Sequence, residues 1–247
     1  MSTEPTAARG EPTAAPGELT VARARADLDA LAARARALVR PGRRVVLGIA
    51  GMPGAGKSTL ARALVTRLDR PGPDGSGEGG RTAYLPMDGF HLPQARLRAL
   101  GRRDRMGAPD TFDAAGYAAT LARVTGTDDA VTAPGFDRTI EEPVPEAVRI
   151  GPDARLVVTE GNYLLLPDGD WCRARSCMVQ VWFVELAEDE RLRRLLARHI
   201  AFGKSPSAAR EWVERVDQPN ALLVGAHAAL ADLRVPVEQL GLEIDAD

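Results

Sequence analysis

The sequence lacks the features that mark several protein classes. Its 247 residues include two cysteines, Cys172 and Cys177, with no second pair, which supports neither a disulfide scaffold nor a zinc site. Apolar runs stay far below the ~18 residues that span a bilayer, and the N-terminus lacks a signal-peptide apolar region. A net charge of −2 gives no basic excess for binding nucleic acid. We therefore expect a cytoplasmic protein that binds neither membrane nor nucleic acid.

Composition changes along the chain and indicates where folded structure begins. Residues 1–17 are rich in Pro, Ala, Thr and Gly and contain almost no large apolar side chain, so we predict a disordered tail. Residues 18–247 are expected to form a single domain, with few aromatics and a core mostly of Ala, Leu and Val. Apolar spacing predicts a helix over residues 28–38. The Gly- and Pro-rich segment 71–80 predicts a flexible connection.

One stretch fits the pattern G-x-x-x-x-G-K-[ST] of a phosphate-binding loop. Its glycines let backbone N–H groups turn toward an anion, Lys57 would reach the β- and γ-phosphates, and Ser58 would ligate Mg²⁺. The flanks agree, because residues 45–50 are a short apolar run and residues 60–68 have helical apolar spacing. We therefore predict a nucleotide-binding loop that contains Gly51, Pro53, Gly54, Ala55, Gly56, Lys57, Ser58 and Thr59.

Further apolar runs alternate with helical patterns along the chain. Strands are predicted at residues 82–86, 156–161, 179–184 and 233–237. Helices are predicted at residues 114–124 with Asp113 as the N-cap, from residue 188 onward, and from Pro206 to about residue 217, where Pro219 would end the helix. Strands that alternate with helices around a phosphate loop imply an α/β fold, a three-layer α/β/α arrangement with a parallel sheet.

Two segments look like additions to this sheet. Residues 92–154 are irregular and rich in charge, Pro and Gly, and within them residues 131–138 read as a short strand that runs into a loop. Such a segment between sheet strands fits an acceptor-binding insertion. Residues 188–206 carry arginines at helical spacing and are expected to form a lid.

Two carboxylates follow predicted strands at the edge where α/β sheets bind ligands. Asp88 comes after the strand 82–86 and could accept the proton of an acceptor hydroxyl, although it could also simply cap the following turn. Glu160 ends the strand 156–161 and could hold Mg²⁺ or orient Asp88. The alternative for Glu160 is a structural carboxylate hydrogen-bonded to the phosphate loop.

Positive charge over the transferring group is a further requirement of phosphoryl transfer. Arg194 and Arg198 could form a clamp on the lid helix, although a charged stripe on a helix is often only a solvated face. His91 and His199 are expected in polar packing or substrate contacts, because they lack metal-ligand spacing. The tryptophans are expected in the core or at an interface; they are Trp171, Trp182 and Trp212.

Several segments match, in order, those of one kinase group and span roughly residues 45–225. They are Gly51–Thr59, Met87–His91, Gly107–Asp113, Pro134–Arg138, Glu160–Tyr163 and Arg191–Lys204. Together they resemble the uridine kinase / pantothenate kinase / phosphoribulokinase group of P-loop kinases. The pattern is most similar to a bacterial subgroup described as nucleoside/nucleotide kinase-like or as a kinase associated with sugar transport.

This resemblance implies ATP and Mg²⁺ as cofactors and assigns roles to particular residues. It implies that Asp88 is the base, that Glu160 lies near Mg²⁺, and that Arg194 and Arg198 touch the phosphates. It places Asn220 near the adenine, as in pantothenate kinases. It implies an acceptor pocket lined by Asp110, Phe112, Asp137 and Arg138, with Phe90, His91 and Tyr163 near it.

The sequence leaves the acceptor and the assembly open. The acceptor loop has no His between Arg138 and Glu141, which departs from uridine kinases, and the pantothenate kinase and phosphoribulokinase signatures are incomplete. We expect phosphorylation of a hydroxyl on a small-molecule acceptor such as a nucleoside, a sugar or a vitamin precursor. The alternative is a nucleotide-dependent switch or accessory ATPase that acts on a protein partner. A homodimer is compatible with either hypothesis.

Overall fold

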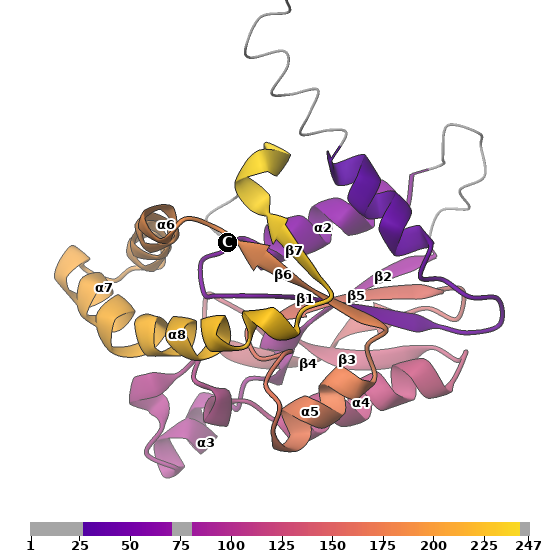
Figure 1. The fold of residues 1–247 in the computed structure, drawn as a ribbon. Helices are drawn as coiled ribbons and strands as arrows, with labels where there is room; N and C mark the ends of the chain where they lie inside the picture. Colours follow the sequence, from indigo (N-terminus) through magenta and orange to yellow (C-terminus); the bar gives the residue numbers. More distant parts are fainter. Residues whose placement is uncertain (1–26, 71–80, 243–247) are drawn as a thin grey trace, which may run out of the picture.

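A computed structural model describes residues 27–70 and 81–242 of the chain (Figure 1). The predicted disordered tail at residues 1–17 and the predicted flexible connection at residues 71–80 lie outside the described residues. The first described helix covers residues 27–36, close to the predicted 28–38.

A five-stranded parallel sheet has the order β2-β5-β1-β6-β7. Its strands are β1 (Val45–Gly51), β2 (Thr82–Pro86), β5 (Leu156–Gly161), β6 (Gln180–Glu185) and β7 (Leu233–Pro236). Each strand was predicted to within a residue or two. Every residue of β1 and β5 is buried, as expected for central strands covered on both faces.

Each face of the sheet carries its own apolar core. Alternate residues of β1 point to opposite sides, so that Val46 packs in one cluster and Leu47 in the other. The helix 27–36 and α2 (Lys57–Leu68) cover one face, and α4 (Ala114–Gly126) and α5 (Gly169–Ser176) lie on the other (Figure 1). The predicted three-layer α/β/α fold is therefore confirmed.

The strand register brings the carboxyl ends of three strands together. Gly161 of β5 pairs with Ala50 of β1, and Glu160 pairs with Pro86 of β2. The segments that follow β1 and β2, and the end of β5, therefore meet at one edge of the sheet, where open α/β sheets bind ligands.

The insertion is more ordered than its sequence indicated. The predicted strand forms as β3 (Val131–Asp137), but it pairs with an antiparallel strand, β4 (Glu142–Ile150), which the sequence did not reveal. Two prolines and two exposed charged residues, Glu146 and Arg149, make β4 hard to recognise, because half-exposed strands need few apolar side chains. Earlier in the insertion, the chain forms the short helix α3 (Gln94–Ala99) (Figure 1).

The prediction that Pro219 ends a helix is wrong. The chain continues from α6 (Glu188–Ala201) into α7 (Pro206–Trp212), the π-helical turn η4 (Val213–Asp217) and α8 (Gln218–Ala226). In η4 the N–H of Gln218 bonds to the carbonyl of Val213, five residues back. Because this wide turn replaces the i→i−4 bonding that a proline ring would obstruct, Pro219 fits at the start of α8.

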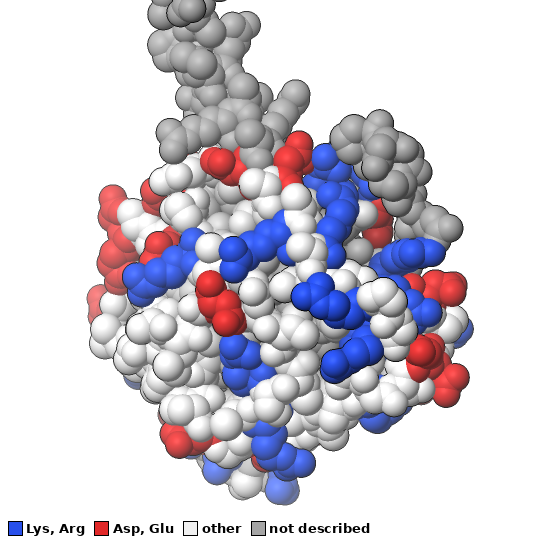
Figure 2. Space-filling model, turned by 45° about the vertical axis from the view of Figure 1, so that its right-hand side comes forward, with Lys and Arg blue, Asp and Glu red and all other residues white. Residues whose placement is uncertain are grey.

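Charged side chains of both signs are scattered over the face seen in Figure 2, most of which is uncharged. Across the described segments, no helix has both the length and the apolar character that crossing a bilayer requires.

Gly89 joins the sheet edge to the hairpin and should not tolerate a side chain. It lies in the short helix η1 (Met87–Phe90), where an added Cβ would stand 2.0 Å from the carbonyl oxygen of Pro134. We expect Gly89→Ala to lower the free energy of unfolding by about 1–3 kcal/mol in a denaturant titration, because backbone must move. Gly126→Ala, which meets nothing within 4 Å, serves as the control and should be neutral or slightly stabilising. Equal stability of the two variants would contradict the prediction.

Candidate active site

The phosphate-loop motif forms a tight turn between β1 and α2. Gly54 and Gly56 have φ of 80° and 89°, the left-handed region that glycine adopts without strain. A Cβ on Gly54 would also lie 2.7 Å from Cγ of Leu195, because α6 packs directly on the loop. Lys57 begins α2, and its Nζ donates to the carbonyl of Met52 at 3.0 Å. The loop thus has the backbone shape that a phosphate cradle needs.

Lys57 is buried, and the two carboxylates near it do not fully offset the effect of that burial on its pKa. Burial lowers its pKa from 10.5 to about 8, although the Glu160 and Asp88 carboxylates partly oppose this shift. An ammonium in this position gains most from an anionic ligand, which restores the charge that burial disfavours.

The protein should therefore take up protons when it binds a nucleotide at a pH near the pKa of Lys57. Near pH 8 about half of the free protein carries a neutral Lys57, and bound phosphates should restore the charge, so uptake approaches roughly half a proton. Calorimetric titration of ATP in buffers of different ionisation enthalpy measures this number. Uptake should be smaller at pH 6.5, where Lys57 is already charged, and absent in Lys57→Met. Equal uptake at both pH values would contradict the assignment.

The same shift predicts how stability depends on pH. Because the folded chain releases the Lys57 proton at a lower pH than the unfolded chain, the unfolded state binds more protons between about pH 8 and 10.5. The contribution of Lys57 to stability therefore rises with pH over this window.

Glu160 and Ser58 place side-chain oxygens that could bind a metal ion beside the loop. Ser58 Oγ donates to Glu160 Oε1 at 3.1 Å, and the Tyr84 hydroxyl donates to the same oxygen at 3.0 Å. Glu160 is 4% exposed, and burial, followed by the nearby Asp88 carboxylate, raises its pKa. A hydroxyl and a poorly compensated carboxylate are hard ligands that suit Mg²⁺.

The described residues contain no group of three or more His, Cys, Asp and Glu side chains that could hold a metal ion by themselves. This fits Mg²⁺, which proteins often hold through one or two side chains together with substrate phosphates and water. Ser58 and Glu160 are the residues that would hold it.

Asp88 lies in η1, immediately after β2, and faces the phosphate loop across a shared cavity. Arg138 Nη2 donates to Asp88 Oδ2 at 2.8 Å. Partial burial would raise the pKa of Asp88, but the surrounding positive charges, led by Arg138, outweigh it and hold this pKa below its ordinary value. Asp88 is therefore ionised at neutral pH and can accept a proton.

His91 is held in one tautomer beside Asp88. Its Nδ1 lies 2.8 Å from the Asp88 carbonyl oxygen, and because a carbonyl only accepts, Nδ1 carries the proton. Burial lowers the pKa of His91, which favours the neutral ring and leaves Nε2 as a hydrogen-bond acceptor. Phe112 and Phe136 pack on the imidazole, with ring centroids at 3.9 and 4.6 Å.

The arginines of α6 have three different environments. Arg191 is 1% exposed, and it donates to the Pro53 carbonyl at 3.2 Å and to both oxygens of Glu188. It therefore ties α6 to the phosphate loop. Arg194 donates through Nε to Glu190 at 2.6 Å and is not among the residues that line the cavity. Arg198 does line the cavity, where burial and then the Arg138 charge lower its pKa.

The lid side of the cavity holds a polar pair that joins two of its helical elements. His199 Nε2 and Asp217 Oδ2 lie 2.7 Å apart and join α6 to η4. Lys204 Nζ lies 4.8 Å above the ring of Trp212. The tryptophans were expected in the core or at an interface: Trp171 and Trp182 are buried in the core, whereas Trp212 lies outside it and lines the cavity. Asp217 is the last residue of the π-helical turn and lines the cavity, and no sequence signal announces such a turn.

These elements line a cavity of about 180 Å³, and four parts of the chain form its wall. The loop contributes Pro53, Gly54, Lys57 and Ser58. The acceptor side contributes Asp88, His91, Met106, Gly107, Phe112, Phe136, Arg138 and Glu141, and the end of β5 contributes Glu160, Gly161 and Asn162. The lid side contributes Arg198, His199, Phe202, Lys204, Trp212, Asp217 and Asn220.

Other residues that were expected at the site lie outside this wall. Phe90 is buried against Tyr117, and Tyr163 is buried with its hydroxyl on the Gly107 carbonyl. Asp110 is paired with Arg105 at 2.7 Å, and Asp137 accepts from the backbone and hydroxyl of Thr139. The loop residues Gly51, Ala55, Gly56 and Thr59 shape the turn without lining the cavity.

Similarity to known proteins agrees with this geometry. Residues 19–76, which include the phosphate loop, match the family described as "Methylmalonyl Co-A mutase-associated GTPase MeaB". Over 203 residues the chain is 35% identical to "Uncharacterized protein YggC" of Escherichia coli (strain K12), covering 82% of each chain. Over 196 residues it is 32% identical to "Putative uridine kinase C227.14" of Schizosaccharomyces pombe, covering 77% of this chain and 80% of that protein.

A solved structure is similar along almost its whole length. The crystal structure described as a "putative fructose transport system kinase" from Silicibacter sp. TM1040 has a TM-score of 0.76 and 31% identity, and the match covers 85% of this chain and 98% of that one. Fold, phosphate loop and relatives agree: the chain belongs to the P-loop kinases, in the group that includes the uridine kinase-like and pantothenate kinase proteins.

Proposed function

We propose that this chain is an ATP- and Mg²⁺-dependent phosphotransferase that phosphorylates a hydroxyl of a small metabolite. One observation carries the proposal: Asp88 and the phosphate loop with Lys57 line the same cavity. A carboxylate near the acceptor hydroxyl, together with positive charge over the transferring phosphoryl group, is what transfer to an alcohol requires.

The reaction is an in-line displacement. The acceptor oxygen forms a bond to the γ-phosphorus, the bond from that phosphorus to the β–γ bridging oxygen breaks, and ADP leaves with the electron pair. The acceptor's hydroxyl proton passes to Asp88. Lys57 neutralises the β/γ-phosphates, Arg198 covers the developing charge from the lid, and bound Mg²⁺ would supply further charge neutralisation at Ser58 and Glu160.

The names of the relatives support a nucleoside, a sugar or a pantothenate-like compound as acceptor. The Schizosaccharomyces pombe protein is described as a "Putative uridine kinase", the Silicibacter structure as a "putative fructose transport system kinase", and shorter matches as pantothenate kinases. These descriptions differ in acceptor, so they support the reaction type more strongly than any one substrate.

The second candidate function is a nucleotide-dependent switch or accessory ATPase that acts on a protein partner. The match of residues 19–76 to a mutase-associated GTPase family favours it. That match ends before Asp88 and covers neither the acceptor side of the cavity nor the lid, so it concerns only the part that both classes of protein share.

A metabolite-library assay at fixed ATP and Mg²⁺ separates the two candidates. Mass spectrometry should detect a phosphorylated product, and ATP turnover should rise with that acceptor. Turnover that is indifferent to every acceptor would favour the switch.

A further inference from the structure

The acceptor side of the cavity contains a guanidinium with unused donors. Arg138 directly follows β3, and its side chain is 31% exposed. Within the described residues its guanidinium makes one hydrogen bond, the 2.8 Å bond from Nη2 to Asp88. A guanidinium has five N–H donors in a planar fork that matches a carboxylate or phosphate. Most of the fork is therefore available to a ligand in the cavity.

A second guanidinium lies close enough to repel the first. The charge of Arg138 is the largest of the charges that lower the pKa of Arg198, after burial itself, and both side chains line the cavity. The proposed reaction uses Arg198 on the nucleotide phosphates, which leaves Arg138 facing the acceptor. An anionic group on the acceptor would reduce the repulsion and fill the free fork.

The aromatic residues of the acceptor side do not form an open stacking slot. Phe112 and Phe136 both pack on the imidazole of His91, at 3.9 and 4.6 Å between centroids. Phe112 also packs edge-on against Tyr163 and Trp171, and it is 7% exposed. Phe112 and the His91 imidazole therefore pack on each other and leave no slot between them, which disfavours a nucleobase stacked on the acceptor side.

The remaining polar groups suit a compact polyol. Asp88 can accept a hydrogen bond from the reacting hydroxyl, and neutral His91 presents Nε2 as an acceptor for a second hydroxyl. Arg138 is hydrogen-bonded to Asp88, so a group bound by Arg138 and a hydroxyl bound by Asp88 lie close together. The anionic group of the acceptor would therefore be only a few atoms from the reacting hydroxyl.

Resting on the proposed kinase function, we propose that the acceptor is a compact, aliphatic, hydroxylated anion, and that Arg138 binds its carboxylate or phosphate. In the free protein, Arg138 donates a hydrogen bond to Asp88 Oδ2. The anionic group of the acceptor binds the remaining N–H donors of Arg138. The other carboxylate oxygen of Asp88 then accepts the proton of the acceptor hydroxyl. This narrows the acceptor class and assigns Arg138 as a specificity-determining residue.

The test compares charged acceptors with their neutral counterparts at saturating ATP. The pairs are glycerate with glycerol, gluconate with glucose, and fructose 6-phosphate with fructose. The first two pairs test a carboxylate and the third tests a phosphate. Uridine and cytidine are included as nucleoside acceptors. We expect at least one anion to exceed its neutral partner by tenfold or more in kcat/KM. Arg138→Gln should abolish that preference, mainly through the KM for the acceptor, with the KM for ATP within about threefold of wild type.

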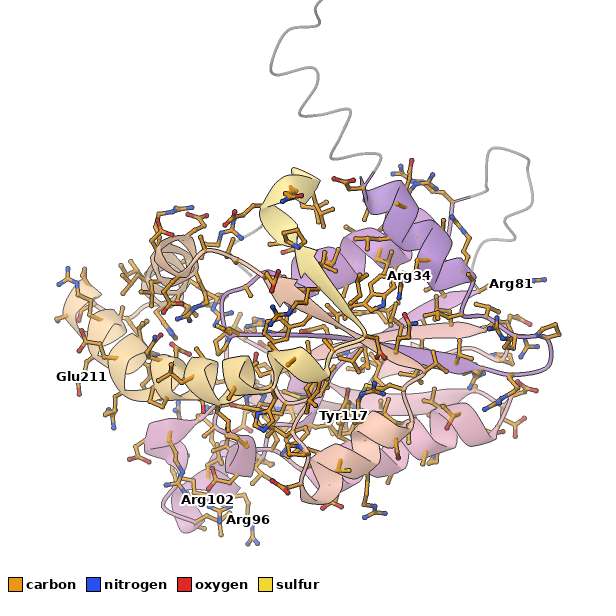
Figure 3. All side chains as sticks on the ribbon, in the orientation of Figure 1. Arg34, Arg81, Arg96, Arg102, Tyr117 and Glu211 are labelled. Atoms are coloured by element: carbon orange, nitrogen blue, oxygen red, sulfur yellow. The ribbon has the colours of Figure 1, made fainter. Side chains whose placement is uncertain are left out.

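Two further variants control the experiment. Arg138→Lys keeps the charge but loses the planar fork, and should retain part of the preference. Arg96→Gln removes an exposed arginine at the outer side of α3, away from the cavity (Figure 3), and should match wild type.

The outcomes distinguish the inference from the function on which it rests. Phosphorylation of neutral sugars or nucleosides with equal or greater efficiency would overturn the inference and leave the kinase proposal intact. An equal loss of kcat for charged and neutral acceptors in Arg138→Gln would also overturn it, because Arg138 would then serve the transferred phosphoryl group. Acceptor-independent ATP turnover across the panel would reject both.

Discussion

Asp88→Asn should reduce phosphoryl transfer to the acceptor by about 10³-fold while ATP binding stays within about threefold of wild type. The amide cannot take the hydroxyl proton, yet it fills the same space beside Arg138 and the loop. Steady-state kinetics with the acceptor identified in the library assay, and calorimetric titration with a non-hydrolysable ATP analogue, measure the two effects separately.

The control for this variant is Asp153→Asn, which makes the same change at an exposed turn and should match wild type. Lost ATP affinity in Asp88→Asn would identify Asp88 as a metal-site or structural residue instead of a base. Transfer at the wild-type rate would remove the main support for the kinase mechanism.

Lys57→Met should abolish detectable activity, with a fall in kcat/KM of about 10³-fold or more, and should weaken ATP binding as well. The buried ammonium is the loop's own positive charge for the β- and γ-phosphates, and the thioether supplies none. Methionine has a similarly long, unbranched side chain that can occupy the same space. It carries no charge, so it avoids the cost of desolvation that lowers the pKa of Lys57 to about 8. The variant should therefore unfold at the same temperature as wild type or a higher one.

Thermal unfolding without nucleotide, together with kinetics, checks both halves of this expectation. Lys57→Arg tests geometry at constant charge, and it should recover little activity because the bulkier guanidinium does not fit where Lys57 Nζ bonds to Met52. A strongly destabilised Lys57→Met would show that the lysine serves the fold rather than the phosphates.

Much of the central sheet could be predicted from the sequence, because its strands are short apolar runs buried on both faces. Val45–Gly51 and Leu156–Gly161 need no partner to be recognised as strands. Asp113 caps α4 through a 2.9 Å bond to the Gly116 N–H, as its position before an apolar helix predicted. Parallel pairing then brings Asp88 and Glu160 to one sheet edge, so the sequence alone predicts that the two carboxylates lie near each other.

Contacts between distant segments could not be predicted in this way. The sequence showed only arginines at helical spacing over residues 188–206. In the structure Arg191 is buried against the phosphate loop, Arg194 pairs with Glu190, and Arg198 lines the cavity. The strand β4 forms because β3 offers it a partner, and its own residues carry little strand signal. Such outcomes depend on which neighbour each side chain meets.

By itself, the sequence determined the α/β fold, the phosphate loop and the carboxylates beside it. The fold and the carboxylate positions follow from local apolar periodicity, and the loop follows from a glycine spacing that few other turns require. Tertiary structure alone decided that Arg138 bonds to Asp88, that His91 is packed between its own aromatic neighbours, and that a π-helical turn directs Asp217 toward His199. These three features join segments far apart in the chain. Their free energies arise from charge, burial and ring contacts that exist only after the sheet, the hairpin and the lid have assembled.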